Sequence, residues 1–246
     1  MHLERIVDTF MDLARELYYY GSNATEIENY ITQIGKTYEL DVQIASIGTV
    51  LYITVIDRTG KSLTRIERIN YTSIDFEKLS IWESFIKKIL KEKPPFTFIR
   101  DEIKRIKYEN KNLVHSFSLL IIAVFIASFS FSFVFKGNLL ESFISGIVGT
   151  TVYYVTINLK NKILRDFIAG FSIYSIIEVF NLFTEIRTYP ILAGAIMVFV
   201  PGLLLTNAIM EIGDRNLVSG VSKLVESVFI LGALVLGAGI ATAIWR

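Results

Sequence analysis

The sequence predicts a membrane protein in which a cytosolic α+β domain precedes an all-α transmembrane bundle of about five helices. Hydrophobic residues make up 52% of the 246 residues and charged residues only 20%, whereas a soluble domain carries about 25% charged residues. Most of the charges lie in the first 112 residues. The spacing of apolar residues also changes along the chain, from helical to alternating and then to long apolar runs. We therefore expect a cytosolic domain at 1–112 and a transmembrane domain at 113–246.

Two amphipathic helices open the first domain. Apolar residues recur at three- and four-residue spacing from Leu3 to Leu17, which predicts a helix that ends near Gly21. Asn23, followed by Glu26 three residues later, resembles a capping box at the start of a second helix. The opening run carries charges throughout its length, so it is not expected to be a cleavable signal peptide.

A change of period at Val42 predicts strands. Apolar residues alternate from there, and residues 57–61 (DRTGK) form a turn signal, so we expect a meander of short antiparallel strands. Further helices are expected at 75–90 and 100–110, separated by prolines 94 and 95. We expect these helices to cover one face of the sheet.

The second half contains about five apolar runs of roughly 20 residues, the length that crosses a hydrocarbon core of about 30 Å. The runs lie at 113–135, 139–159, 163–183, 189–210 and 217–245. Buried helices of a large soluble core are the alternative, but successive runs of this kind favour membrane spans. Basic residues gather before the first run and between the second and third. The positive-inside rule therefore predicts a multi-pass protein with a cytosolic amino terminus.

Four segments of the chain form a recognisable set: residues 21–28 (GSNATEIE), the strand meander after Asp41, 201–209 (PGLLLTNAI) and 217–220 (LVSG). Together they resemble the threonine/serine exporter family. The similarity covers nearly the whole chain. Where the family pattern more often ends in Arg-Asp, this chain has Met210 and Glu211.

The resemblance implies an architecture and a function. The full family architecture joins a soluble domain and about five spans to a second set of about five, so this chain is similar to the larger subunit of the split, two-component members. The resemblance implies a secondary exporter, not an enzyme, in a bacterial or archaeal cytoplasmic (inner) membrane. It would move threonine- or serine-like amino acids or small dicarboxylates out of the cytosol. It would work in a hetero-oligomer with a small membrane subunit of about five spans.

The Pro-Gly pair at 201–202 predicts a helix opened inside the membrane. Proline removes one donor and clashes with the preceding turn, so backbone carbonyls are released. In transporters such breaks present half-helix ends to a substrate. Thr206 and Asn207 lie a turn further on and offer donors and acceptors, so the predicted substrate-binding residues are Pro201, Gly202, Thr206 and Asn207. An ordinary kink, with its polar residues bonded to a neighbouring helix, is the alternative.

Two acids are predicted to couple transport to protons. Glu178 lies in an apolar run, where a charged side chain costs about 2.5 to 3.5 kcal/mol, so it is expected to face a cavity or a partner. Glu211 ends the run that contains the Pro-Gly pair. For Glu178, a position close enough to the outer interface to reach water is the alternative.

Other chemistry finds little support in the sequence. The chain has no cysteine and only 2 histidines, and it lacks a phosphate-binding loop, so we expect no catalytic residues, cofactor or metal site. Basic residues before the first span are interleaved with acids, which favours contact with the lipid bilayer over nucleic acid. A homo-oligomer is left open. The alternative function is a membrane-anchored sensor or scaffold that acts through its cytosolic domain.

Overall fold

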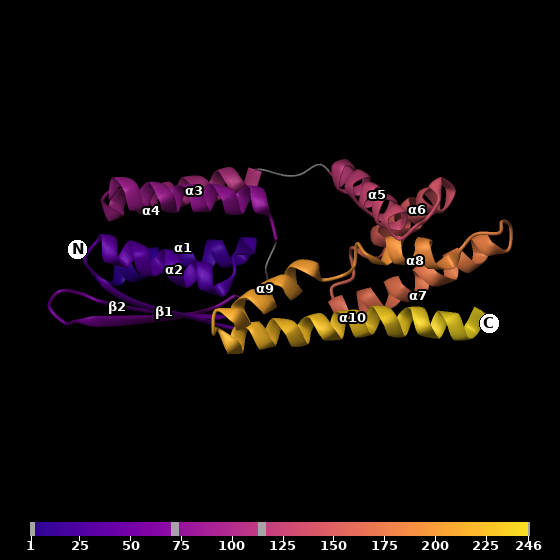
Figure 1. Ribbon diagram of the computed structural model, residues 1–246. Helices are drawn as coiled ribbons and strands as arrows, with labels where there is room; N and C mark the ends of the chain where they lie inside the picture. Colours follow the sequence, from indigo (N-terminus) through magenta and orange to yellow (C-terminus); the bar gives the residue numbers. More distant parts are fainter. Residues whose placement is uncertain (1–2, 70–73, 113–116, 246) are drawn as a thin grey trace. The chain divides into compact units, whose positions relative to one another are not determined.

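The computed structural model (Figure 1) describes residues 3–69, 74–112 and 117–245, and the chain divides into two compact units. Unit 1 comprises 1–114 together with 206–223, and unit 2 comprises 115–205 together with 224–246. The described residues are mostly helical and contain one three-stranded sheet.

Unit 1 is built from helices packed on the small sheet. Its first elements are α1 (Leu3–Tyr20), α2 (Ala24–Thr37), β1 (Asp41–Ile47), β2 (Val50–Ile56), β3 (Ser62–Arg68), α3 (Phe76–Glu92) and α4 (Phe96–Asn112). The three strands are antiparallel in the order β1-β2-β3, as the alternating pattern predicted. The inner side chains of β2 are fully buried, and α1 and α2 cover that face. Helices α3 and α4 lie on the other side of α1, which gives three layers (Figure 1).

The connection between α1 and α2 follows the sequence signals closely. Gly21 takes a φ of 102°, a left-handed conformation that glycine adopts without strain. The backbone N–H of Ser22 donates to the Leu17 carbonyl at 3.0 Å and closes the end of α1. Asn23 then caps α2, because its side-chain oxygen accepts from the Glu26 N–H at 2.8 Å. The predicted helix end near Gly21 and the predicted start at Asn23 are both confirmed.

Unit 1 also takes in a helical hairpin from much later in the chain. We call residues 206–223 the hairpin; it consists of the end of α9 (Gly202–Gly213), a short connection and the start of α10 (Leu217–Trp245). Gly220 lies so close to α9 that a Cβ there would sit 2.9 Å from the Ala208 carbonyl oxygen. The Asn216 N–H closes the turn by donating to the Glu211 carbonyl at 2.8 Å. The hairpin is therefore tightly packed on itself.

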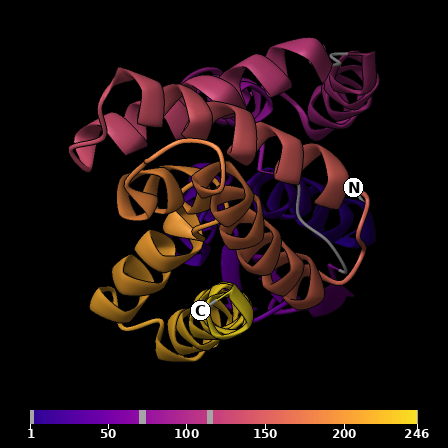
Figure 2. The same ribbon diagram turned by 90° about the vertical axis from the view of Figure 1, so that its right-hand side faces the viewer.

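The regular secondary structure of unit 2 is entirely helical among its described residues. It contains α5 (Phe117–Val134), α6 (Leu139–Thr156), α7 (Lys162–Asn181), α8 (Thr188–Ile196), the first residues of α9 and the larger part of α10. Small residues allow close packing: a Cβ at Gly194 of α8 would sit 2.6 Å from the Ser128 carbonyl oxygen of α5. Figure 2 looks nearly along α10 from its carboxyl end. Helix α7 packs directly on α10 through glycines on both helices.

The predicted fold class, a cytosolic α+β domain followed by a bundle of about five transmembrane helices, is wrong. Among the described residues only two helices, Phe117–Val134 and Leu217–Trp245, are long and apolar enough to cross a membrane. The compact unit that holds the sheet is also not purely amino-terminal, because it includes the hairpin. The start of the predicted span 113–135, at residues 113–116, lies outside the described residues.

The missing spans have physical reasons. The predicted span 189–210 is two helices of 9 and 12 residues, which rise only about 14 and 18 Å at 1.5 Å per residue. Helices α6 and α7 form where the sequence predicted helices, but they carry buried acids such as Glu141 and Asp166. The length of an apolar run therefore overestimated the number of spans.

Candidate functional site

The predicted interruption at Pro201 is present. Helix α8 ends at Ile196, Pro201 lies outside any helix, and α9 starts at Gly202. Tight turns fill the gap: the Phe199 N–H donates to the Ile196 carbonyl at 2.8 Å, and the Gly202 N–H donates to the Val200 carbonyl at 2.8 Å. Proline supplies no N–H and blocks the preceding turn, so the helix cannot run through.

The four predicted substrate-binding residues do not fall in one unit. Pro201 and Gly202 belong to unit 2, whereas Thr206 and Asn207 belong to the hairpin of unit 1. Thr206 is exposed and Asn207 is half-buried. Within neither unit do the four residues form one site, so their joint role in substrate binding stays a prediction.

Glu178 sits among neutral donors near the end of α7. It is half-buried, and its carboxylate accepts from the Asn181 amide at 3.3 Å and from the Thr188 hydroxyl at 3.4 Å. The Asn181 amide also donates to the Thr188 hydroxyl oxygen at 2.9 Å. The three side chains therefore form a small polar group where α7 and α8 meet. Among the described residues the donors to this carboxylate are neutral, and the proton-coupling role of Glu178 stays a prediction.

Glu141 is the best-satisfied acid of unit 2. It is only 2% exposed and accepts from Arg187 through Nε at 2.9 Å and through Nη2 at 2.7 Å. The Asn138 N–H donates to the same carboxylate at 2.8 Å, which completes a capping box at the start of α6. A carboxylate held by a forked guanidinium and by backbone donors fixes geometry. Glu141 therefore joins the connection before α6, through Asn138, to the connection before α8, through Arg187.

Asp166 is a buried acid that the sequence analysis did not single out. It is 0% exposed in α7, and its Oδ1 lies 2.8 Å from both Nε and Nη2 of the adjacent Arg165. Its Oδ2 has no hydrogen-bond partner among the described residues. The signal in the sequence is an acid at the fourth position of the apolar run 163–183. Asp166 is the more deeply buried of the two acids.

Glu211 is fully buried in unit 1, at the amino-terminal end of α2. Its Oε1 accepts from the Ala24 N–H at 2.7 Å and forms an ion pair with Lys223 of α10. A negative charge at this end of a helix is favourable, because the first N–H groups lack partners within the helix. The structure thus places the two predicted proton-coupling residues, Glu178 and Glu211, in different units.

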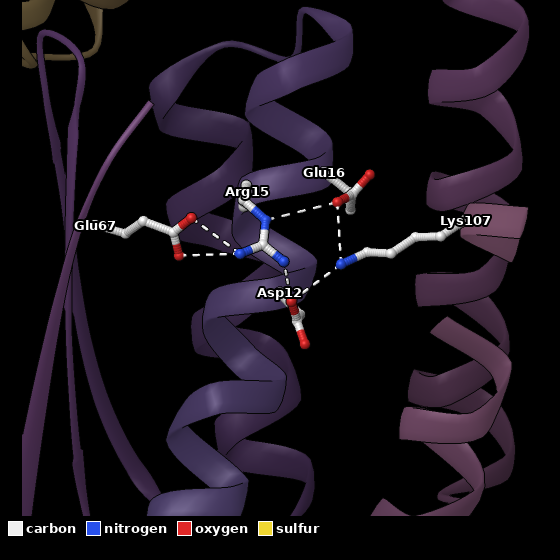
Figure 3. A network of polar contacts seen from close by, with 5 residues as sticks. All are labelled: Asp12, Arg15, Glu16, Glu67 and Lys107. Carbon is white, nitrogen blue, oxygen red and sulfur yellow. Dashed lines mark hydrogen bonds and ion pairs between the residues drawn. The ribbon is translucent and has the colours of Figure 1, made fainter. Parts of the chain in front are cut away.

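A second polar network of unit 1 joins its three layers (Figure 3). Arg15 of α1 lies 2.9 Å from the Glu67 carboxylate of β3, and Lys107 of α4 lies 3.0 Å from Asp12 and 3.2 Å from Glu16. Arg15 also pairs with Asp12 beside it. Each of the five side chains forms at least one ion pair within the network, which therefore joins α1 to β3 and to α4.

No group of three or more His, Cys, Asp and Glu side chains is arranged to hold a metal ion in the part of the chain that the structure describes. The candidate functional elements are therefore the interrupted helix around Pro201 and the buried acids of the two units.

Comparison with protein families matches residues 8–245 to the family described as threonine/serine exporters. The match covers nearly the whole chain, including both units. No curated protein and no solved structure matches the chain.

Proposed function

The chain belongs to the threonine/serine exporter family, and on that premise we propose that it exports small polar metabolites, foremost threonine- and serine-like amino acids, from the cytosol. The family match over 8–245 is the observation that carries this proposal. The exporter family, together with two described helices long and apolar enough to span, supports a membrane protein. The family is one of transporters rather than enzymes.

The interrupted helix supports a transport role. A break at membrane depth is tolerated where the freed backbone groups face protein or a water-filled passage. Helices α8 and α9 are each too short to span and are separated by Pro201, as in half-helices that present their ends to a solute. The carboxylate and ammonium of an amino acid are the groups that helix ends and buried acids bind.

We also propose that this chain needs a partner. The two candidate spans found among the described residues are few for a passage through a bilayer, so a small membrane subunit, or further copies of this chain, would complete the path. Co-expression with a small membrane protein encoded beside it, followed by purification through a tag on one chain, tests the first arrangement. Recovery of this chain alone, as an active homo-oligomer, would favour the second.

The function itself is tested in vesicles. Purified protein, with and without the small subunit, would be reconstituted with labelled threonine, serine or succinate inside, and efflux measured under an imposed pH gradient. We expect efflux of the hydroxyl amino acids. Faster efflux of succinate would indicate that small dicarboxylates are the substrates. No movement of any solute under any gradient would contradict export.

A membrane-anchored sensor or scaffold is the second candidate. It is favoured by the finding that only two described helices have the length and composition of a span, which suits an anchor as well as a transporter. A sensor predicts that unit 1 binds a ligand or protein while the vesicles move nothing. Binding without flux would therefore select this candidate.

We propose that the amino terminus faces the cytosol, because basic residues gather before the first long apolar helix. The chain has no cysteine, so single cysteines can be placed freely. A cysteine at Glu39, whose side chain is exposed, should react with an impermeant maleimide only after cells are opened. Labelling in intact cells would reverse the orientation.

A further inference from the structure

A cluster of polar groups fastens the hairpin to the start of α2 within unit 1. The Ala24 N–H donates to Glu211 at 2.7 Å, as described above. On the other side, the Asn216 amide donates to Glu28 of α2 at 3.3 Å, and the Ser46 N–H of β1 donates to the same Glu28 oxygen at 2.8 Å. Two carboxylates therefore join the hairpin to α2: Glu211, which belongs to the hairpin, and Glu28, which belongs to α2.

The two carboxylates have different surroundings. Glu211 pairs with the Lys223 ammonium and accepts from the Ala24 N–H at the positive end of α2. Among the described residues, Glu28 accepts from the Asn216 amide and the Ser46 backbone N–H, which are both neutral donors. Burial raises the pKa of Glu28 above its ordinary value of 4.5, and the Glu211 charge raises it further, against the opposing effect of the two hydrogen bonds.

Three buried polar oxygens of the elements that form this cluster have no hydrogen-bond partner among the described residues. Ser46 is 1% exposed, and its hydroxyl has no partner among the described residues. The Thr25 hydroxyl, one turn before Glu28 on α2, is likewise buried and unpartnered there, as is the second carboxylate oxygen of Glu211. A carboxylic acid O–H is a donor, and hydroxyl and carboxylate oxygens can accept from it. The Glu211 charge lies close enough to Glu28 to disfavour its ionised form, so the site favours a proton on Glu28.

We propose that Glu28 and Glu211 form a proton-binding site that attaches the hairpin to α2, with the proton carried on Glu28. The proton adds to a carboxylate oxygen of Glu28, while Glu211 keeps its contacts with Lys223 and the Ala24 N–H. The titratable groups of the site are Glu28 of α2, Glu211 of α9 and Lys223 of α10, and the β1 group that contacts Glu28 is the neutral Ser46 N–H.

The sign of the pH effect follows from linkage. Detaching the hairpin returns Glu28 to water and removes Glu211 from its neighbourhood, so its pKa falls back toward 4.5. Attachment is then strongest below pH 4.5 and weakens as the pH rises through the higher pKa of the attached state. Acidification fastens the hairpin, and alkalinisation loosens it.

The hairpin also carries Thr206 and Asn207, which the sequence assigns to the substrate. A proton-dependent attachment would therefore let pH control the segment that bears them. This consequence rests on the proposed function, whereas the attachment itself does not.

Pulsed electron resonance on the full-length protein in lipid nanodiscs tests the attachment. Spin labels on cysteines at Asn29 of α2 and Asp214 of the hairpin, both exposed, report their separation. Between about pH 5 and about pH 9 we expect one narrow distance to broaden and lengthen, with a midpoint above the ordinary glutamate value of 4.5. A distribution that does not change with pH would overturn the proposal.

Two variants locate the titrating group. Glu28→Gln keeps the shape and the acceptor but cannot lose a proton, so its distance should stay narrow at every pH. Glu26→Gln removes an exposed acid from the same helix and should keep the pH response. If Glu28→Gln does not fold, Glu28→Ala must still give a distribution that is independent of pH. A pH response that persists without Glu28 refutes the assignment, and because no flux is measured, failure of export is a separate result.

Discussion

Gly170 of α7 lies so close to Leu234 of α10 that a Cβ at position 170 would sit 2.2 Å from the Leu234 carbonyl oxygen. Gly237 makes the reciprocal approach, since its Cβ would sit 2.1 Å from the Phe167 carbonyl oxygen. Small residues that let two backbones meet are a common way to join helices in membranes, where apolar side chains gain little by leaving lipid. The α7–α10 contact therefore depends on these two glycines.

Replacing Gly170 with alanine should weaken this contact. The clash is with backbone, which cannot rotate away, so we expect a loss of about 1 to 3 kcal/mol of stability. Thermal unfolding in detergent measures it. Gly232→Ala on α10 is the matched control, because a Cβ there meets nothing within 4 Å. That control should be neutral or stabilising by up to about 1 kcal/mol, and equal losses in both variants would contradict the close contact.

Replacing Pro201 with alanine should reduce export. Alanine removes a helix-interior penalty of about 3 kcal/mol and allows α8 and α9 to join. If the helix break forms part of the substrate path, efflux from vesicles should fall by about tenfold or more. A tenfold loss of rate corresponds to about 1.4 kcal/mol of activation barrier.

The control is Pro190→Ala, which changes a proline in the first turn of α8, where proline is tolerated. It should leave efflux near that of the parent. Unchanged efflux in Pro201→Ala, together with normal folding, would show that the break is an ordinary kink.

Replacing Glu178 with glutamine tests proton coupling in unit 2. Glutamine keeps the contacts with Asn181 and Thr188 but cannot exchange a proton, so efflux driven by a pH gradient should fall while exchange of solute at equal pH persists. Asp166→Asn is the comparison, because Asp166 is the fully buried acid of the same helix. If only Asp166→Asn abolishes the pH-driven component of efflux, Asp166 is the residue that couples transport to protons. An intact pH response in both variants would show that neither acid has this role.

Replacing Arg15 with alanine should destabilise unit 1. It leaves Glu67, Asp12 and Glu16 with one fewer cation, and the group is only about one-third exposed, so we expect a loss of about 1 to 2 kcal/mol. Chemical denaturation followed by tryptophan fluorescence measures it, since Trp82 is buried in this unit.

Arg58→Ala is the matched control for Arg15. Arg58 pairs with Glu39, and both side chains are 71% exposed. Exposed pairs contribute little, so the change should stay within about 0.5 kcal/mol. A loss as large as that of Arg15→Ala would mean that network geometry has no special role.

The local features of this protein were readable from short stretches of sequence. Gly21 and Asn23 marked the end of one helix and the start of the next because left-handed backbone and side-chain capping depend on near neighbours alone. The strand meander and the break at Pro201 were predicted for the same reason, since alternation and the missing proline N–H act within a few residues.

Long-range relationships could not be predicted in this way. Nothing in the neighbourhood of Glu211 indicates that it reaches the N–H of Ala24, 187 residues earlier, or that residues 206–223 join the unit that holds the sheet. The number of spans was overestimated because apolar composition describes a buried helix as well as a lipid-facing one.

By itself the sequence determined the helices, the three strands, the interrupted helix and the family, because each depends on residue types at short and regular spacing. Only the tertiary structure decided which acids are buried and which partners they meet. The free energy of a buried charge is set by groups brought together in space, and the order of residues along a chain does not record that distance.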